Sequence, residues 1–406
     1  MKRADCPLIF GLASTGARHW ALIVGQGDEV ATNSGIKSGH TRTLATPHGR
    51  PLHVICARDV GLFSLLQQVI AQLPWARGEG RTPVVYFGPE CLYFVEGGYR
   101  GADTVWEYYF EPVEPGVTAA VVGQELREWI PSFVSGAQRD NLGRQMADGT
   151  FVSYHYGDAP GLRGRALPIP FGALDPSRGL RRRARRVLDE NVRLRPYLTE
   201  EIEAFQRSRM RPGAPTIGVH MRGTDAVSTG ERRYFRRGSL DRDAYMKKIR
   251  QLLERWPGAQ VFVATDDQAS LDWLRGRFGS RVIAREGSRH ESGETAGKGP
   301  LGWLMPAYLT KSLDAGAKNG EEAIIECLLL SRCDILLHNG SALARTALLF
   351  EPELQHVSLN PNNHWSRILR NFPEAADDWV KRRLLWYLPA LGEFWRAMRS
   401  RLGWLR

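Results

Sequence analysis

Three short, largely apolar segments in the second half of the chain are each followed by a cluster of polar residues. The segments cover residues 216–219, 260–264 and 334–337, and the clusters after them read HMRGTD, TDD and HNGS. Short apolar runs bounded by polar residues are typical of strands buried on both faces of a parallel sheet. The pattern therefore predicts three buried strands, each with polar or charged side chains at its carboxyl end.

Helical patterns alternate with these strands, at residues 243–256, 268–278 and 320–331. Strict alternation of strand and helix favours right-handed crossovers and a parallel sheet. The carboxyl ends of parallel strands meet at one edge of the sheet, which is where open α/β sheets bind their ligands. We therefore predict an α/β fold with a ligand site at this edge.

The first half of the chain shows a second unit of this type. Strand patterns at residues 52–56 and 82–87 flank a helical pattern at 61–73, and residues 26–50 read as loop. An aromatic-rich stretch, TVWEYYF at 104–110, is open to two interpretations. It packs in the core or forms a helical lid, or it forms an aromatic wall against which a sugar acceptor binds.

The break between the two units is predicted near residue 210, before Pro212 and Gly213. An arginine-rich helical pattern at 178–195 precedes it. Such a run is typical of a solvated helix face, with an anionic partner as the alternative. We divide the chain into residues 1–210, residues 211–360, and a basic, tryptophan-rich tail at 361–406.

The composition narrows the range of partners. The chain has 406 residues, is 43% hydrophobic and carries a net charge of +11, which favours anionic partners. Nothing in the sequence resembles a nucleic-acid-binding motif, so we expect no nucleic acid partner. The tail at 361–406 is open to two interpretations: a helix that packs on the fold, or an amphipathic helix on an anionic membrane surface.

Five scattered cysteines form neither a zinc-binding spacing nor a disulfide pattern. This usage fits a reducing cytoplasm. No stretch approaches the roughly 20 apolar residues of a membrane-spanning helix, and we expect no signal peptide. We therefore expect a cytoplasmic protein, with peripheral attachment to the inner membrane face as an option for the tail.

Three segments carry a resemblance to a known family. TIGVHMRGTDAV, VFVATDD and EEAIIECLLLSRCDILLHNGSALART resemble, in order and spacing, the motifs of the α-1,6-fucosyltransferase superfamily. This superfamily includes bacterial nodulation and core N-glycan fucosyltransferases and, more distantly, protein O-fucosyltransferases. The segments GLFSLLQQVIAQL and WEYYFEP are similar to its first domain. The resemblance covers residues 55 to 360 and is strongest over 190–350.

The resemblance implies a GT-B fold, in which two Rossmann-like domains enclose a cleft. It implies an inverting glycosyltransferase that transfers fucose from GDP-fucose to a hydroxyl of a glycan or glycolipid, with no cofactor and no metal. Gly223 and Ala226 stand where several relatives have basic residues, which leaves another nucleotide sugar as an alternative donor. A non-catalytic module that binds nucleotide sugars or glycans is the alternative from another class.

The residues themselves indicate a phosphate site. Cleavage of a sugar–diphosphate bond builds negative charge, which Arg222 would meet with a bidentate guanidinium. Ser341 is predicted to cap a helix at 342–350, and Gly340 would let the backbone approach a ligand beside Asn339. Arg345, one turn into that helix, would add a second cation or pair with a carboxylate.

The resemblance assigns further roles. Glu326 stands at the position of the acidic residue that reads the guanine base, with a structural ion pair as the alternative. His220 and Asp225 would line the donor pocket, and Asp266 and Asp267 would bind the donor or orient loops without a metal. Glu231 is the candidate general base. The acceptor-side candidates of the first domain are Gly61, Phe63, Ser64, Trp106 and Tyr109.

Overall fold

The structure of the chain is a computed structural model. It describes residues 49–58, 60–135, 143–154, 167, 169, 175–222, 242–291, 295–298, 304–306, 312 and 314–359. The chain divides into two compact units, Met1–Arg42 and Thr43–Arg406, and all of the described residues belong to the second. Two predicted site residues, Asp225 and Glu231, and the tail at 361–406 lie outside the described residues. The predicted division near residue 210 stays a prediction.

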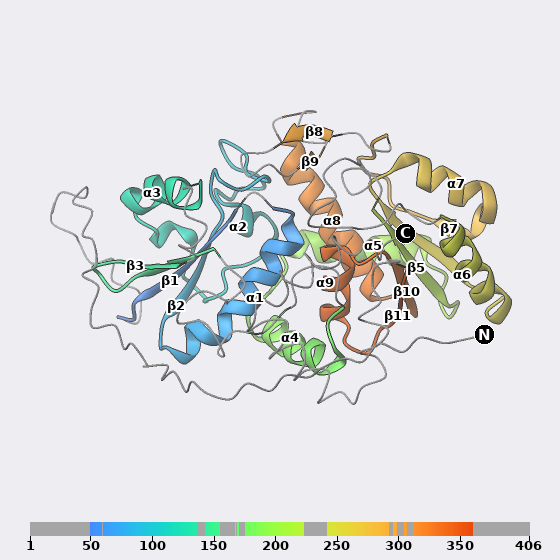
Figure 1. The fold of residues 1–406 in the computed structure, drawn as a ribbon, viewed down its shortest axis with the longest axis horizontal. Helices are drawn as coiled ribbons and strands as arrows, with labels where there is room; N and C mark the ends of the chain where they lie inside the picture. Colours follow the sequence, from blue (N-terminus) through green and yellow to red (C-terminus); the bar gives the residue numbers. More distant parts are fainter. Residues whose placement is uncertain are drawn as a thin grey trace, which may run out of the picture. The chain divides into compact units, whose positions relative to one another are not determined.

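The first sheet has the strand order β2-β1-β4-β3 (Figure 1). Strands β1 (Leu52–Cys56), β2 (Thr82–Tyr86) and β4 (Phe151–Ser153) are parallel, and β3 (Gly143–Gln145) runs antiparallel to β4. Helix α1 (Leu62–Gly78) connects β1 to β2. The predicted βαβ unit is confirmed, although α1 continues through Pro74 and ends five residues beyond the predicted helix.

Several helical elements lie between β2 and the first strand of the second sheet. They are α2 (Val105–Tyr109), the 3-10 turn η1 (Ala119–Val121), α3 (Gln124–Ser135), α4 (Arg178–Asn191) and α5 (Pro196–Arg209). Ser177 caps α4 by accepting a hydrogen bond from the Leu180 amide. Several arginines of α4 form ion pairs within the chain. Arg178 and Arg182 pair with Glu353, and Arg185 pairs with Asp189.

The second sheet has five parallel strands in the order β11-β10-β5-β6-β7. The strands are β5 (Thr216–Met221), β6 (Gln260–Thr265), β7 (Val282–Ile283), β10 (Ile335–His338) and β11 (Gln355–Ser358). The helices are α6 (Arg242–Arg255), α7 (Gln268–Phe278), α8 (Ala315–Ser331) and α9 (Ala342–Phe350), with a 3-10 turn η2 (Gly279–Arg281) and a hairpin of β8 (Thr295–Lys298) and β9 (Leu304–Pro306). The alternation predicted from the sequence is confirmed. Strand β5 is two residues longer than predicted, and α8 begins five residues earlier.

Successive side chains of this sheet point to opposite faces, and each face is covered by helices. Val219 of β5 and Val261 and Val263 of β6 belong to one apolar cluster with residues of α6 and α7. Phe262 and Ala264 belong to a second cluster with residues of α8, α9 and α1. Burial on both faces explains why these strands read as continuous apolar runs.

Helix α9 contacts helix α1, which connects β1 and β2 of the first sheet. The Gln67 side-chain amide donates to the Thr346 hydroxyl (2.9 Å) and to the carbonyl oxygen of Ala342 (3.1 Å). The same cluster of buried residues includes Ile55 from β1 and Leu336 from β10. The two sheets therefore share one apolar core through α1, α8 and α9. None of the helices among the described residues is long and apolar enough to cross a membrane.

Candidate functional site

The chain order reverses between β5 and β10. From β5 the chain moves outward through β6 and β7, and it then returns to the other side of β5 to form β10 and β11 (Figure 1). In open parallel sheets, a crevice for ligands forms at the carboxyl ends of the two strands that flank such a reversal. This topology identifies the ends of β5 and β10 as the candidate site.

The strand register brings the predicted polar clusters together. His338 of β10, His220 of β5 and Ala264 of β6 lie in one row, and Met221 pairs with Thr265 one residue later. All three clusters therefore start at the same edge of the sheet. The prediction that they share one edge is confirmed.

The end of β5 is held rigidly just before Arg222. The buried ring of His220 donates from Nδ1 to the carbonyl oxygen of Ala264 (3.1 Å). The Tyr245 hydroxyl donates to the carbonyl of His220 (2.8 Å), and the Thr265 hydroxyl donates to the carbonyl of Met221 (2.6 Å). These bonds tie β5 to β6 and α6. His220 therefore supports the strand end on which Arg222, a half-buried residue, is mounted.

Asn339 links the ends of β10 and β5. Its Nδ2 donates to the main-chain carbonyl of Arg222 (3.4 Å). The side chain is only 8% exposed, and its Oδ1 meets no hydrogen-bond donor in the part of the chain that the structure describes. A buried amide with an unused acceptor can receive a hydrogen bond from a ligand.

The turn into α9 has the form of an anion site. Gly340 has φ of +82°, a conformation that glycine adopts without steric cost, and its N–H donates to Nδ1 of His338 (3.0 Å). Ser341 caps α9 by accepting from the Ala344 amide (3.1 Å), as predicted. The N–H groups of the next residues are left open, because none of Ser341, Ala342 and Leu343 donates to an acceptor among the described residues. Open amides at a helix start attract anions.

Arg345 lies one turn into α9 and is 5% exposed. Arg345 is therefore a buried cation in α9, the helix that begins directly after the Gly340 turn. Its predicted role toward the donor stays a prediction.

Asp267 lies at the start of α7. Its carboxylate, 1% exposed, caps α7 by accepting from the Ser270 amide (3.1 Å) and from the Ser270 hydroxyl, and it lies 3.5 Å from Arg242. These contacts place the carboxylate at the start of α7, and its two predicted roles, donor binding or orientation of a loop, stay predictions. Asp266 is half-buried, and its carbonyl accepts from the His290 amide (3.0 Å).

Glu326 lies on α8 within a cluster of charged groups. Burial raises the pKa of its carboxyl from the ordinary 4.5 to about 7, although Arg289 and Arg285 act in the opposite direction. Asp266 and Glu322 also interact with it and raise the pKa further. The next residue, Cys327, contacts the carbonyl of Leu343 through its thiol (3.5 Å), so the turn of α8 that carries Glu326 lies against the first turn of α9.

The predicted acceptor-side aromatics lie in the core. Trp106 is 2% exposed and donates from Nε1 to the carbonyl of Glu111 (3.0 Å). Tyr109 is fully buried, and its hydroxyl donates to the carbonyl of Ala317 on α8 (2.7 Å). A sugar needs an exposed ring face, so the proposed aromatic wall was wrong for these two residues, and core packing was the correct alternative.

The other acceptor-side candidates lie at the start of α1. Phe63 is buried in the core, Ser64 is half-buried, and Gly61 is exposed at the amino-terminal end of the helix. Only Gly61 and Ser64 are therefore placed where a ligand could touch them.

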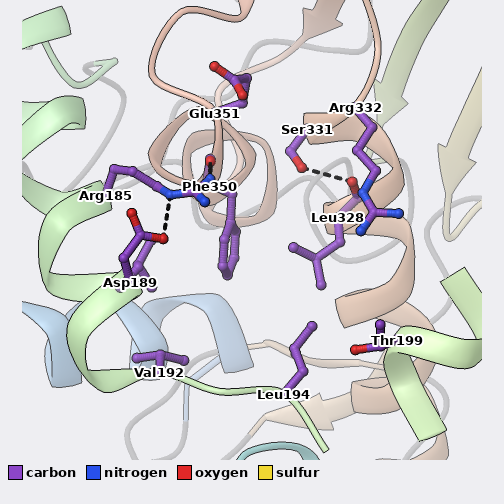
Figure 2. A pocket seen from close by; sticks show the side chains of 11 residues that line it. Arg185, Asp189, Val192, Leu194, Thr199, Leu328, Ser331, Arg332, Phe350 and Glu351 are labelled. Atoms are coloured by element: carbon purple, nitrogen blue, oxygen red, sulfur yellow. Dashed lines mark hydrogen bonds and ion pairs between the residues drawn. The ribbon is translucent and has the colours of Figure 1, made fainter. Parts of the chain in front are cut away.

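A cavity of about 430 Å³ lies at the other end of α9, next to Phe350 and Glu351 (Figure 2). It is bordered by α4, by residues 192–199 and by the last turn of α8. The polar groups around it are used locally, because Arg185 pairs with Asp189 and also donates to the carbonyl of Phe350. The cavity lies at the carboxyl-terminal end of α9, whereas the Gly340 turn lies at the amino-terminal end of this helix.

Sequence reasoning missed one group next to the site. His338 is fully buried beside His356 of β11 and Asp175, which precedes α4. The only sequence signal was the position of His338, directly before Asn339 at a strand end. Nothing in the local pattern pointed to Asp175 or His356.

No protein-family model matches the chain, and no curated protein matches it in sequence. Among solved structures, it is similar to a NodZ α-1,6-fucosyltransferase soaked with GDP-fucose: 21% identity, a TM-score of 0.47, and coverage of 77% of this chain and 97% of that one. It is also similar to POFUT1 in complex with GDP-fucose (14%, TM-score 0.42, 77% and 97%) and to an Arabidopsis thaliana FUT1 mutant in complex with GDP (13%, TM-score 0.44, 78% and 72%). Its α/β fold, with two largely parallel sheets, follows from its own strand pairing.

Proposed function

We propose that the chain is a glycosyltransferase of the GT-B type that transfers fucose from GDP-fucose to a hydroxyl of a glycan or glycolipid. The sequence motifs that resemble the α-1,6-fucosyltransferase superfamily support this proposal. Their positions in the fold support it too, because each motif includes a strand of the second sheet together with the polar residues at its carboxyl end.

One observation carries the proposal: an open helix start lies beside an arginine at the reversal point of a parallel sheet. The amides of the cap residue Ser341 and of Ala342 and Leu343 lie at the start of α9, and Asn339 holds the backbone of Arg222 next to this turn. Amide groups, the helix dipole and a guanidinium together suit a diphosphate. This is the group that a nucleotide-sugar donor presents at its reacting end.

The proposed reaction is a single displacement with inversion at the anomeric carbon. The acceptor oxygen forms a bond to that carbon as the bond to the diphosphate oxygen breaks, and the electron pair of the broken bond leaves with GDP. Arg222 and the α9 amides would stabilise the charge that develops on the leaving phosphate. A general base must take the acceptor proton, and Glu231 remains our candidate.

We propose that Glu326 reads the guanine base. A carboxylate accepts hydrogen bonds from both N1–H and the exocyclic amine of guanine, an arrangement that adenine and uracil do not offer. The contact between Cys327 and Leu343 supports this role, because it brings the Glu326 turn of α8 close to the proposed phosphate site. Only the ionised form of Glu326 can accept both bonds.

Two alternative functions would use the same binding site. Another nucleotide sugar would use the same diphosphate contacts, because Gly223 and Ala226 supply no charge to select fucose. A non-catalytic nucleotide-sugar or glycan-binding module would bind and not turn over. We place the protein in the cytoplasm, with the tail at 361–406 as a candidate for peripheral attachment to an anionic membrane.

A donor screen tests the proposal. The protein is incubated with GDP-fucose, GDP-mannose, UDP-glucose and UDP-galactose, with and without a glycan mixture, and release of the nucleoside diphosphate is followed. We expect release from GDP-fucose above all others, and we expect it to persist in excess EDTA. Release from another donor alone supports the first alternative, binding without release supports the second, and loss in EDTA with recovery in Mn²⁺ contradicts metal independence.

A further inference from the structure

A fourth polar segment, residues 284–290, follows the edge strand β7 of the second sheet. Strand β7 is parallel to β6, so this loop starts at the same edge of the sheet as the clusters after β5, β6 and β10. The loop then runs along the end of β6, where the His290 amide donates to the carbonyl of Asp266 (3.0 Å) and the Gln268 amide donates to that of His290 (3.1 Å). The loop after β7 is therefore fixed beside the carboxyl end of β6.

The same loop is anchored on helix α8. The Ser288 amide donates to Oε2 of Glu322 (3.0 Å), an acceptor that a glutamine at this position would also offer. Gly287 lies against this carboxylate, because a Cβ at residue 287 would be 3.1 Å from Oε2. Glu322 and Glu326 lie one turn apart on the same face of α8. The loop therefore passes beside the face of α8 that carries Glu326.

Arg289 follows Ser288 directly, and its guanidinium folds back over the loop. Nη2 donates to the carbonyl of Arg285 (2.6 Å), and Nη1 donates to that of Gly287 (3.5 Å). These two bonds use two of the five N–H groups that a guanidinium carries. Nε is buried, and its N–H meets no acceptor in the part of the chain that the structure describes. A buried donor of this kind costs free energy, which an acceptor atom of a ligand would remove.

The charge of Arg289 acts on Glu326 without a direct contact between the two side chains. Burial raises the pKa of Glu326 to about 7, and Arg289 opposes this rise more strongly than Arg285 does. Glu326 nevertheless forms no ion pair and no side-chain hydrogen bond with any described residue. A carboxylate and a guanidinium therefore lie within electrostatic reach of each other, and both have hydrogen-bonding capacity left for a third group.

This combination complements the Watson–Crick edge of guanine. That edge presents the exocyclic amine, N1–H and O6 in a row, which makes two donors followed by one acceptor. In the proposed function Glu326 accepts from the two donors, and O6 is left without a partner. Adenine has an amine at the position of O6 and a lone pair on N1, so it would place a donor against the guanidinium and a lone pair against the carboxylate.

We propose that Arg289 is a specificity-determining residue that donates a hydrogen bond to O6 of the guanine bound by Glu326. The inference rests on the proposed function and adds a second contact to the base. Glu326 places the base, so Arg289 meets O6 only while this carboxylate holds guanine in position. The two bonds from Arg289 to carbonyls of its own loop fix the guanidinium before the ligand binds, which reduces the entropy lost on binding.

The first test uses the native protein and a ligand that differs from GDP in one atom. In 6-thio-GDP the amine and N1–H are kept, and O6 is replaced by sulfur, which is a weak acceptor. Calorimetric titration should give a Kd for 6-thio-GDP about tenfold above that for GDP. Equal Kd values for the two nucleotides would overturn the inference, and this comparison does not depend on the folding of a variant.

The second test repeats the titrations with Arg289→Met, which keeps a long side chain and removes all of its donors. The ratio of the Kd for 6-thio-GDP to the Kd for GDP should fall from about tenfold to below about twofold. IDP keeps O6 and lacks the amine that Glu326 would bind, so the ratio of its Kd to that of GDP should keep its native value. A distorted loop or a changed charge on Glu326 would weaken binding of GDP and 6-thio-GDP together. The first ratio would then stay at its native value, which overturns the inference.

Arg281→Met is the matched control. Arg281 precedes β7 at the opposite edge of the sheet, and its guanidinium also donates to a main-chain carbonyl, that of Pro257 (2.7 Å). We expect this variant to keep the native Kd for GDP and both native ratios, and a fall of the 6-thio-GDP ratio here as well would overturn the inference. If the native protein binds none of the three nucleotides, the proposed function fails and the inference with it. If the native protein binds GDP and Arg289→Met keeps the native ratio, only the inference fails.

Discussion

The side-chain amide of Asn339 donates to the main-chain carbonyl of Arg222 over 3.4 Å. This bond joins the carboxyl ends of β10 and β5, whose strands are neighbours in the sheet although 117 residues separate the two partners in sequence. It lies directly beside the glycine turn that begins α9. The arginine proposed to meet the leaving phosphate and the amides proposed to bind it are therefore parts of one hydrogen-bonded unit.

Arg222 is expected to contribute mainly to the chemical step. Arg222→Ala should lower turnover of GDP-fucose by about 100-fold, because it removes a donor that acts on developing charge. Arg222→Lys should recover only part of this, since an ammonium keeps the charge without the bidentate fork. Turnover is followed as GDP release. Arg207→Ala, which removes an exposed arginine of α5, should have no effect. Near-native turnover in Arg222→Ala would exclude Arg222 from the mechanism.

GDP should stabilise the protein more than UDP or ADP. A ligand present at 100 times its Kd adds about 2.7 kcal/mol to the free energy of unfolding, which is visible as a higher melting temperature. In Glu326→Gln the preference for GDP should disappear, because an amide cannot accept from both guanine donors. Glu322→Gln, one turn earlier on α8, is the matched control and should keep the preference. Equal shifts for all three nucleotides in the native protein would defeat the assignment of Glu326.

The affinity for GDP should increase with pH. The pKa of Glu326 is raised to about 7 by burial, so the carboxyl is largely neutral at pH 6 and ionised at pH 8. Since guanine binds the ionised form, Kd should fall about tenfold between these two values. Titration calorimetry of the native protein and of Glu326→Gln gives the comparison. A flat profile in the variant and a sloping one in the native protein support the assignment, and parallel profiles contradict it.

The same pKa has a consequence for stability. The folded-state value lies above the ordinary 4.5, so the contribution of Glu326 to the free energy of unfolding is greatest below pH 4.5. It is lost as pH rises from there to about 7. The effect runs opposite to the pH dependence of GDP binding, and ligand-free melting curves of the native protein and of Glu326→Gln separate the two.

Asp267 is expected to matter for stability and not for GDP binding. Asp267→Ala removes the cap of α7 and should lower the free energy of unfolding by about 1–2 kcal/mol. It should leave the Kd for GDP unchanged, since the carboxylate is buried against Ser270 and Arg242. Denaturant unfolding and calorimetry provide the two measurements. A large loss of GDP affinity at native stability would restore Asp267 to the donor site.

Several parts of the site were predictable from local sequence. The cap at Ser341 followed from a small hydroxyl residue placed between a strand and a helical pattern. The shared edge followed from strict alternation of strands and helices. Tyr109 was misjudged as an acceptor-side residue, because residue type alone does not distinguish a core ring from an exposed one.

The sequence by itself determined strands β1, β2, β5, β6 and β10, the helices that follow them, and the polar residues at the ends of β5, β6 and β10, because apolar periodicity and turn-forming residues are local properties. Only the tertiary structure decided that β5 and β10 are neighbours, that Asn339 reaches Arg222, and that Asp175, His338 and His356 meet behind the Gly340 turn. These contacts join segments that are far apart in the chain. They arise from how helices and strands pack, which no local pattern encodes.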